Sequence, residues 1–256
     1  MEECHNGSGG GRLYVVGTGP GHLDHMTQAA QTAIKKSDVI VGYKTYLDLI
    51  PELLVDKEVM SSAMMKEVDR CGKAIELAAA GRTVSLVCGG DPGIYAMAGL
   101  VYEMVRAHGS AISVEVVPGI AALNACAARL GAPLMHDFAA ISLSDLLTPW
   151  EVIEKRLRAA AMADFVIVIY NPRSKKRVEQ LVKARDIVMA ERGPQTPVGI
   201  VTAATRDNEK IELTTLEDLL NCEVGMQSSV IIGNSQTFIW QEVMITPRGY
   251  TRKYEL

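Results

Sequence analysis

The chain alternates between short apolar runs and longer segments in which apolar residues recur at helical spacing. Several of the apolar runs end at glycine, proline or asparagine, which is typical of buried strands followed by turns. The runs predict strands at residues 13–16, 38–42, 55–60, 83–88, 114–117, 138–143, 164–170, 197–202, 210–213, 230–232 and 238–245. The periodic segments predict helices at 27–36, 63–80, 92–108, 120–130, 149–161 and 175–191, with shorter helical pieces at 43–50 and 216–220.

Strands that alternate with helices at this spacing indicate an α/β protein with mostly parallel sheets. The length of 256 residues allows one large domain or two of ordinary size. From the periodicity we expect a flexible, glycine-rich leader over residues 1–11, an N-terminal α/β domain over 12–125 and a C-terminal α/β domain over 126–256.

The segment from Thr83 to Tyr95 is the clearest of the strand-to-helix corners. A buried strand is followed by Gly89 and Gly90, which allow a sharp turn and a close approach to a ligand. Asp91 is a good N-cap, and a proline follows it at the first helical position. Such corners bind ligands at the carboxyl end of open α/β sheets, although turn and cap chemistry alone would also explain every residue.

An earlier corner, residues 17–21 (GTGPG), superficially resembles a dinucleotide-binding fingerprint. Residue 22 is histidine where the fingerprint needs a third glycine, and Pro20 stiffens the loop. The pattern therefore disfavours a nicotinamide-dinucleotide site.

Composition and charge narrow the class further. The chain is 48% hydrophobic and carries a net charge of −4, which argues against nucleic acid as a partner. No apolar run approaches the ~18 residues of a membrane span, and we find no signal-peptide pattern. The cysteines are odd in number and form no Cys-x-x-Cys pair, so we expect reduced thiols in a cytoplasmic protein. Cys4-His5 lacks a partner pair, and we predict no metal site.

Four corners stand in order at residues 17–21 (GTGPG), 89–92 (GGDP), 117–120 (VPGI) and 170–173 (YNPR). In this order and spacing the chain resembles the tetrapyrrole methylases over residues 12–246. Three further stretches resemble, within that family, the precorrin-3B (or cobalt-precorrin-3) carbon-17 methyltransferases of cobalamin synthesis. They are residues 136–150, 170–177 and 205–209.

The resemblance implies a class III S-adenosylmethionine-dependent methyltransferase fold, with the active site in the cleft between two domains. The family holds the cofactor mostly by backbone groups, which suits glycine and alanine corners. Matched position by position, the resemblance implies cofactor contacts at Pro20, Gly89, Gly90, Asp91, Ile94, Ala121, Ala122, Asn171 and Ala204.

Methyl transfer from a sulfonium is an in-line displacement in which alignment supplies much of the rate, so it requires no protein nucleophile. The ring contraction that the family performs calls for an acid and a base near the cleft. His22 and Asp24, just past the Pro20 loop, are our candidates. The alternative is that Asp24 caps the next helix and His22 is a solvated loop residue.

The implied macrocycle carries many carboxylates, which arginine, lysine and hydroxyl groups would bind. We expect substrate contacts at Lys44, Ser142, Arg173 and Arg206. The basic run 175–177 follows Arg173, and a solvated helix face is the simpler reading of it.

Other functions remain open at this stage. One is a sibling methylase acting at a different carbon, or the diphthine-type methylase of the same fold. The other is a non-catalytic nucleotide-binding module that uses the glycine loops. The resemblance also implies a homodimer.

Overall fold

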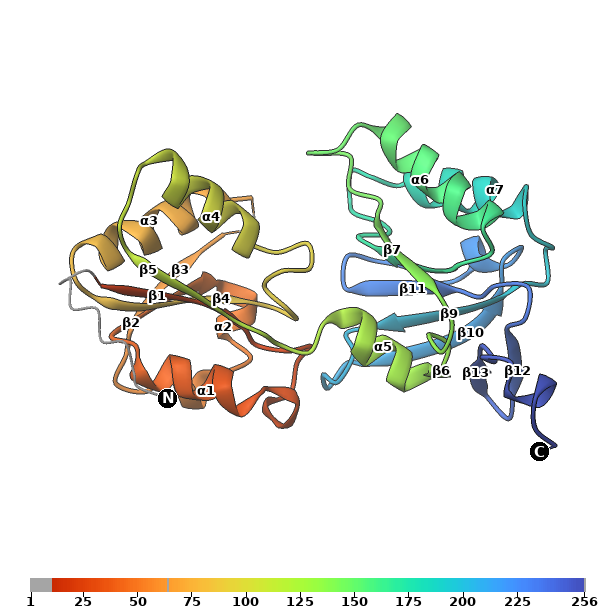
Figure 1. Ribbon diagram of the computed structural model, residues 1–256, viewed down its shortest axis with the longest axis horizontal. Coiled ribbons are helices and arrows are strands. Elements are labelled where there is room, and N and C mark those ends of the chain that lie inside the picture. The colour runs from red at the N-terminus through yellow and green to blue at the C-terminus, as the bar shows by residue number, and fades with distance from the viewer. Residues whose placement is uncertain (1–10, 64, 256) are drawn as a thin grey trace. The chain divides into compact units, whose positions relative to one another are not determined.

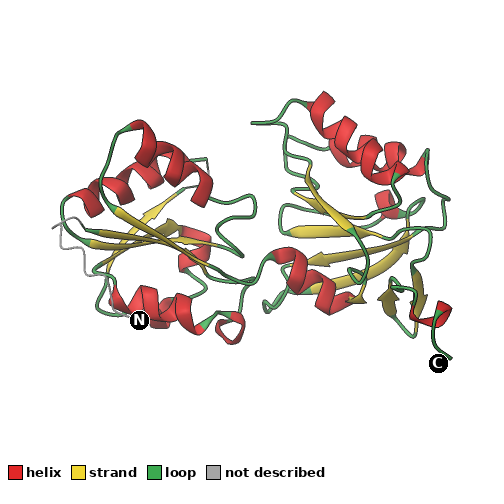
Figure 2. Ribbon diagram, in the orientation of Figure 1, coloured by secondary structure: helices red, strands yellow, loops and turns green. Residues whose placement is uncertain are grey.

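The computed structural model describes residues 11–63 and 65–255, so Cys4, His5 and the rest of the predicted leader up to residue 10 lie outside the described residues. The chain divides into two compact units, and the division falls between Ala121 and Ala122. Both units combine helices with sheet (Figures 1 and 2). Each unit is described by itself.

The first unit is built on a parallel sheet with the strand order β3-β2-β4-β1-β5. All four of its pairings are parallel, as the sequence predicts. Because the strands run in one direction, their carboxyl ends share one edge. The strands are β1 Arg12–Gly17, β2 Val39–Tyr43, β3 Glu58–Ser62, β4 Thr83–Cys88 and β5 Ser113–Val117.

Helices cover both faces of this sheet, and each strand alternates its side chains between them (Figure 1). Leu13 and Val15 pack with α3 and α4 in one core cluster, whereas Tyr14 and Val16 pack with α1 in another. Both faces are therefore apolar, which explains the nearly continuous apolar runs. The helices are α1 Gln28–Lys36, α2 Lys44–Leu47, α3 Glu67–Ala79 and α4 Ala98–Ala107, with short 3-10 helices at Leu23–His25 and Pro51–Leu53.

Two helices of the first unit differ from the prediction. α4 begins at Ala98 rather than at residue 92, so a loop over 89–97 lies between β4 and the helix. On α3 the buried positions include Cys71, Ala74 and Ala78, while Val68 is 60% exposed. The periodicity of this segment predicts Met64, Val68, Ile75 and Ala79 on the buried face. Ile75 is buried as predicted, whereas the prediction was wrong for Val68 and Ala79, which are exposed. Met64 lies outside the described residues.

The second unit contains a sheet with the order β10-β9-β11-β8-β7. Only the β7–β8 pairing is parallel, and the other three are antiparallel. The prediction of a mostly parallel sheet was wrong here, because β9 and β10 are joined by a short loop without a crossover helix. The strands are β7 Phe138–Ser142, β8 Val166–Tyr170, β9 Pro197–Thr202, β10 Lys210–Thr215 and β11 Ser228–Ile232.

Figure 1 shows α6 and α7 together over one face of this sheet and α5 over the other. On the α5 face, a Cβ on Gly199 of β9 would lie 2.4 Å from Leu130, so glycine lets this helix pack closely. The helices are α5 Ala122–Leu130, α6 Trp150–Met162 and α7 Glu179–Met189, with short 3-10 helices at Leu219–Asn221 and Tyr250–Arg252.

Two further predictions for this unit need correction. α7 begins at Glu179, and Ser174 caps a turn instead, since its Oγ accepts a hydrogen bond from the Arg177 N–H at 3.1 Å. The predicted strand over 238–245 is a hairpin of β12 Phe238–Trp240 and β13 Val243–Ile245. Its turn residues, Gln241 and Glu242, both have positive φ. The hairpin forms a small sheet with β6 Gly131–Ala132.

Candidate functional site

Three loops of the first unit meet at the carboxyl edge of its sheet. They follow β1, β4 and β5, which are neighbours in the strand order. Gly19 and Gly90 form a two-way backbone bridge, with N···O distances of 3.1 and 2.7 Å. The sequence predicted each corner separately, and the parallel sheet brings them together.

Glycine is required at these corners because main chain packs directly against main chain. A Cβ on Gly119 would lie 2.2 Å from the Gly90 carbonyl oxygen, and one on Gly17 would lie 2.6 Å from that same oxygen. Gly19 and Gly90 also have positive φ, at +75° and +70°. The three loops therefore contact one another largely through their peptide groups.

Asp91 fastens two of the three loops. Its Oδ1 accepts a hydrogen bond from the Gly93 N–H at 2.8 Å, and its Oδ2 accepts one from the Gly119 N–H at 3.2 Å. The expected role as N-cap of the following helix was wrong, because Met97 occupies that position. The residue that resembles a helix cap in sequence holds the loop after β4 against the loop after β5.

The other cofactor-binding candidates of the first unit lie in or next to these loops. Pro20 and Ala121 are buried, and Ile94 is half-buried. The ring of Tyr46, from α2, packs where a Cβ on Gly89 would lie, at 2.4 Å. Lys44 also follows a strand at this edge, and its Nζ forms an ion pair with Asp48 at 2.9 Å.

His22 and Asp24 contact each other beyond the Pro20 loop. The His22 Nδ1 accepts a hydrogen bond from the Asp24 N–H at 3.3 Å and lies 3.3 Å from the Asp24 Oδ2. The His22 side chain is 62% exposed and that of Asp24 84% exposed. The cap of α1 is Thr27, whose Oγ1 accepts from the Ala30 N–H, so the alternative of Asp24 as its cap was wrong.

Sequence reasoning missed Arg70, a buried cation at the same edge of the first sheet. Its Nε donates to the Ser62 Oγ at 2.7 Å and its Nη2 to the Ala63 carbonyl at 3.0 Å. The guanidinium lies over the Tyr43 ring, 5.9 Å from its centroid. The available signal was position, because residue 70 belongs to the buried stripe of α3.

The second unit also gathers predicted residues at one edge. β7, β8 and β9 point in the same direction, since β8 and β9 are both antiparallel to β11. At their carboxyl ends the Asn171 Nδ2 donates to the Ser142 Oγ at 3.0 Å. The Leu123 N–H donates to the Tyr170 hydroxyl at 2.9 Å, which places Ala122 and the start of α5 at this edge.

Arg177 is a second residue whose role the sequence did not show. Its Nη2 donates to the Asn171 carbonyl at 3.1 Å, and its Nη1 lies 3.4 Å from the Ser144 Oγ. Asn171 has a φ of +50°, so this bond supports a backbone conformation that asparagine tolerates. The simpler reading of the run 175–177 as a solvated helix face was wrong for Arg177, which ties the loops after β7 and β8 together.

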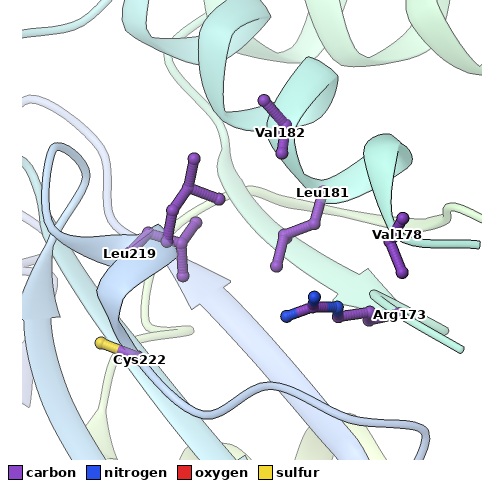
Figure 3. Close-up of a pocket in the computed structure, with 7 residues that line it drawn as sticks. Arg173, Val178, Leu181, Val182, Leu219 and Cys222 are labelled. Carbon is purple, nitrogen blue, oxygen red and sulfur yellow. The ribbon is translucent and has the colours of Figure 1, made fainter. Parts of the chain in front are cut away.

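Arg173 lies apart from that network. Together with residues of α7 and of the 3-10 helix at Leu219–Asn221 it lines a pocket of about 120 Å³ (Figure 3). After β9, Ala204 is buried between Ala203 and Thr205, which both have positive φ. The Arg206 N–H closes this turn by donating to the Ala203 carbonyl at 3.0 Å.

The thiols of the described residues are suited to packing rather than to nucleophilic attack. Burial raises the pKa of Cys88 to about 12 and the pKa values of Cys71 and Cys126 to about 11. They are therefore neutral at physiological pH. Within residues 11–63 and 65–255, no group of three or more His, Cys, Asp and Glu side chains is placed to hold a metal ion.

No helix in the described part of the chain has the length and apolar character needed to cross a membrane.

Comparison with protein families and curated relatives gives consistent matches. The family model for tetrapyrrole (corrin/porphyrin) methylases matches residues 12–220. A relative from Priestia megaterium named cobalt-factor III methyltransferase is 52% identical over 96% of the chain, which spans 46% of that relative's length. A relative from Salmonella typhimurium, named "Probable cobalt-factor III C(17)-methyltransferase", is 51% identical over 93% of this chain and 99% of its own.

Solved structures share the fold. One described as the methyltransferase CobJ aligns with a TM-score of 0.87 at 37% identity, covering 93% of this chain and 100% of its own. A uroporphyrin-III C-methyl transferase from Thermus thermophilus, solved with S-adenyl homocysteine, aligns with a TM-score of 0.68 at 25% identity. That alignment covers 87% of this chain and 97% of the other.

Proposed function

Because the chain belongs to the tetrapyrrole (corrin/porphyrin) methylases, we propose that it methylates carbon 17 of cobalt-factor III or precorrin-3B, with ring contraction, in cobalamin biosynthesis. The methyl donor is S-adenosylmethionine. The observation that carries the proposal is the 51% identity to the Salmonella typhimurium relative, which the chain matches over 99% of its length and whose name specifies carbon 17.

The residues present fit this donor. S-adenosylmethionine offers polar groups along its whole length, and peptide N–H and C=O groups can pair with them without side-chain bulk. The proposed contacts of the first unit, Gly89, Gly90 and Asp91, lie in the loop after β4, where the bridge to Gly19 holds the main chain of Gly90 in place. Pro20 and Ile94 are their apolar neighbours. The proposed contacts at and beyond the division of the chain are Ala121, Ala122, Asn171 and Ala204.

When bound, S-adenosylmethionine supplies a methyl group that its sulfonium charge already activates. What the chain must provide is alignment, which can account for a large part of the rate of a displacement. Two clamps support this alignment, because Asp91 holds the loops after β4 and β5, and Arg177 holds Asn171. Both clamps bond to backbone groups. A ligand that contacts this backbone is therefore oriented without a flexible side chain between the ligand and the fold.

For ring contraction we assign the acid–base role to His22 and Asp24. The two side chains are exposed and contact each other, which leaves both able to exchange protons. A neutral His22 that accepts at Nδ1 carries its proton on Nε2, where it can be donated.

Lys44, Ser142, Arg173 and Arg206 are the proposed contacts for the macrocycle. Ser142 supports Asn171 directly, and Lys44 forms its ion pair with Asp48. Exchange of that exposed partner for a substrate carboxylate costs little, because surface ion pairs contribute only ~0–1 kcal/mol.

A homodimer and a cytoplasmic location complete the proposal. Exposed apolar side chains on β12, at Phe238, Ile239 and Trp240, support association of two copies. Unpaired thiols at the four described cysteines support a reducing compartment. Size-exclusion chromatography with light scattering measures the oligomeric state.

A single-turnover reaction tests the function. The purified chain is mixed with S-adenosylmethionine and either cobalt-factor III or precorrin-3B, and the tetrapyrrole is analysed by mass spectrometry. We expect a gain of one methyl group, with the new carbon located at position 17 by NMR. Methylation at another carbon would instead support a sibling methylase, and unchanged mass with both substrates would refute the proposal.

A further inference from the structure

We propose that the pocket beside Arg173 receives one propionate arm of the tetrapyrrole. This inference rests on the proposed function and assigns one substrate contact within it. The pocket lies in the second unit, where Arg173 follows Asn171 and Pro172 beyond the carboxyl end of β8. Its volume is about 120 Å³, which suits a small aliphatic group such as one carboxylate-bearing arm. The lining consists of Arg173, Val178, Leu181, Val182, Leu219, Leu220 and Cys222.

The cation in this pocket is available to a ligand. Among the described residues Arg173 has neither a hydrogen bond nor an ion pair, whereas Arg177, in the same segment, is bonded to Asn171 and Ser144. Figure 3 shows the Arg173 guanidinium extending past Leu181 toward Leu219 and Cys222. A planar guanidinium without a partner is well suited to pair with a carboxylate through two parallel hydrogen bonds.

The wall of the pocket matches the stem of the arm. Leu181 and Leu219 are buried in the core of this unit, while Val178 and Val182 on either side of the start of α7 are 44% and 38% exposed. A methylene stem in the pocket would cover the exposed surface of these valines. A propionate stem is one methylene longer than an acetate stem, so it would cover more of this wall.

No lining residue opposes a carboxylate. Arg173 carries the only formal charge among the lining residues, and no aspartate or glutamate contributes to the pocket. Cys222 Sγ donates to the Asp218 carbonyl at 3.6 Å, and partial burial raises the pKa of its thiol, so the sulfur stays neutral. Within the lining, Arg173 therefore supplies the attraction for an anion, and the carboxylates of Glu212 and Asp218 act on the Cys222 thiol from outside the lining.

Substitutions separate the pocket from the rest of the site. In Arg173→Gln we expect the KM for cobalt-factor III to rise roughly ten- to a hundredfold, as for loss of a charged hydrogen-bonded pair. The kcat and the affinity for S-adenosylhomocysteine should stay at wild-type values. Val182→Asp, which adds a negative charge to the wall, should raise KM in the same direction, and Arg173→Lys should lie between Arg173→Gln and wild type.

Lys176→Gln is the matched control, because Lys176 is an exposed cation in the same segment that does not line the pocket. It should leave KM unchanged. A second experiment uses cobalt-factor III in which the propionates are converted to methyl esters. With this substrate the ratio of KM values between Arg173→Gln and wild type should fall to about one, whereas esters of the acetate arms should leave the ratio intact.

The outcomes are distinguishable. A wild-type chain that neither binds S-adenosylhomocysteine nor methylates the macrocycle refutes the proposed function and the pocket assignment with it. An active wild type with an unchanged KM in Arg173→Gln refutes the pocket alone. Equal loss in Lys176→Gln, or a parallel loss of S-adenosylhomocysteine affinity in Arg173→Gln, also overturns the assignment. Circular dichroism and thermal unfolding verify that each variant is folded.

Discussion

The Asp91 carboxylate accepts the N–H of Gly119, a residue 28 positions away along the chain, at 3.2 Å. Its other oxygen accepts the N–H of Gly93 at 2.8 Å. One side chain thus fixes the loop after β4 and joins it to the loop after β5. In the parallel sheet these two strands flank β1. The carboxylate therefore links the loops that lie on either side of the loop after β1.

Removal of this carboxylate should loosen the proposed cofactor site. In Asp91→Ala we expect S-adenosylhomocysteine to bind about tenfold more weakly, since two backbone donors lose their charged acceptor. Asp91→Asn keeps one acceptor oxygen and should lose less. Isothermal titration calorimetry measures both. Glu103→Ala, an exposed carboxylate on α4, is the control; wild-type affinity in Asp91→Ala would show that the clamp is dispensable.

The close approach of three main-chain segments makes a second prediction. Gly119→Ala would place a Cβ 2.2 Å from the Gly90 carbonyl oxygen, so backbone must shift. We expect the free energy of unfolding to fall by about 2 kcal/mol or more, in the range of other overpacked sites. Urea denaturation measures it. Gly99→Ala on α4 meets nothing within 4 Å and should be neutral or stabilise by ~0.5–1 kcal/mol.

Arg177 gives a third prediction, for the second unit. Arg177→Ala frees the Asn171 carbonyl and the loop after β7, so we expect kcat/KM to fall about tenfold, or ~1.4 kcal/mol. The affinity for S-adenosylhomocysteine should fall with it, in contrast to the Arg173 variants. Lys175→Ala, an exposed neighbour, should match wild type in both measurements. If the two variants behave alike, Arg177 does not position Asn171.

The buried thiols predict a dependence of stability on alkaline pH. Burial raises the pKa of Cys88 from 9.0 to about 12, so the unfolded chain loses this proton before the folded chain does. The protonated Cys88 thiol therefore contributes fully to the free energy of unfolding below pH 9. This contribution is lost as the pH rises toward 12. Cys71 and Cys126 act in the same direction up to about pH 11. Urea denaturation at a series of pH values should show a smaller decline in Cys88→Ala; an identical decline would contradict the assignment.

The first unit could be predicted almost completely from the sequence, because its signals are local. The central strands β2, β4 and β1 are mostly apolar on both faces, and parallel strands with crossover helices leave few alternatives. The start of α4 could not be predicted in this way. Asp91 and Pro92 have the chemistry of a helix start, but the Asp91 carboxylate bonds Gly119, and a contact across that distance leaves no local pattern.

The second unit was harder to predict for the same reason. The apolar pattern shows where β9, β10 and β11 lie but not in which direction each strand runs. That direction depends on connecting segments that are too short to hold a crossover helix. The candidate site residues differ in the same way. Asn171 and Ala204 were proposed from the resemblance, whereas Arg177 and Arg70 look like ordinary basic residues in the sequence until their partners are seen.

The contact between Gly17, Gly90 and Gly119 limits which substitutions this surface can accept during evolution. Peptide groups are the same whichever side chains surround them, so recognition built from main chain persists while the neighbouring sequence drifts. Substitution at such a surface can only add atoms where none fit. A ligand analogue that binds through these peptide groups would therefore meet few viable resistance mutations in the chain, because the residues that could exclude it are those that hold the loops together.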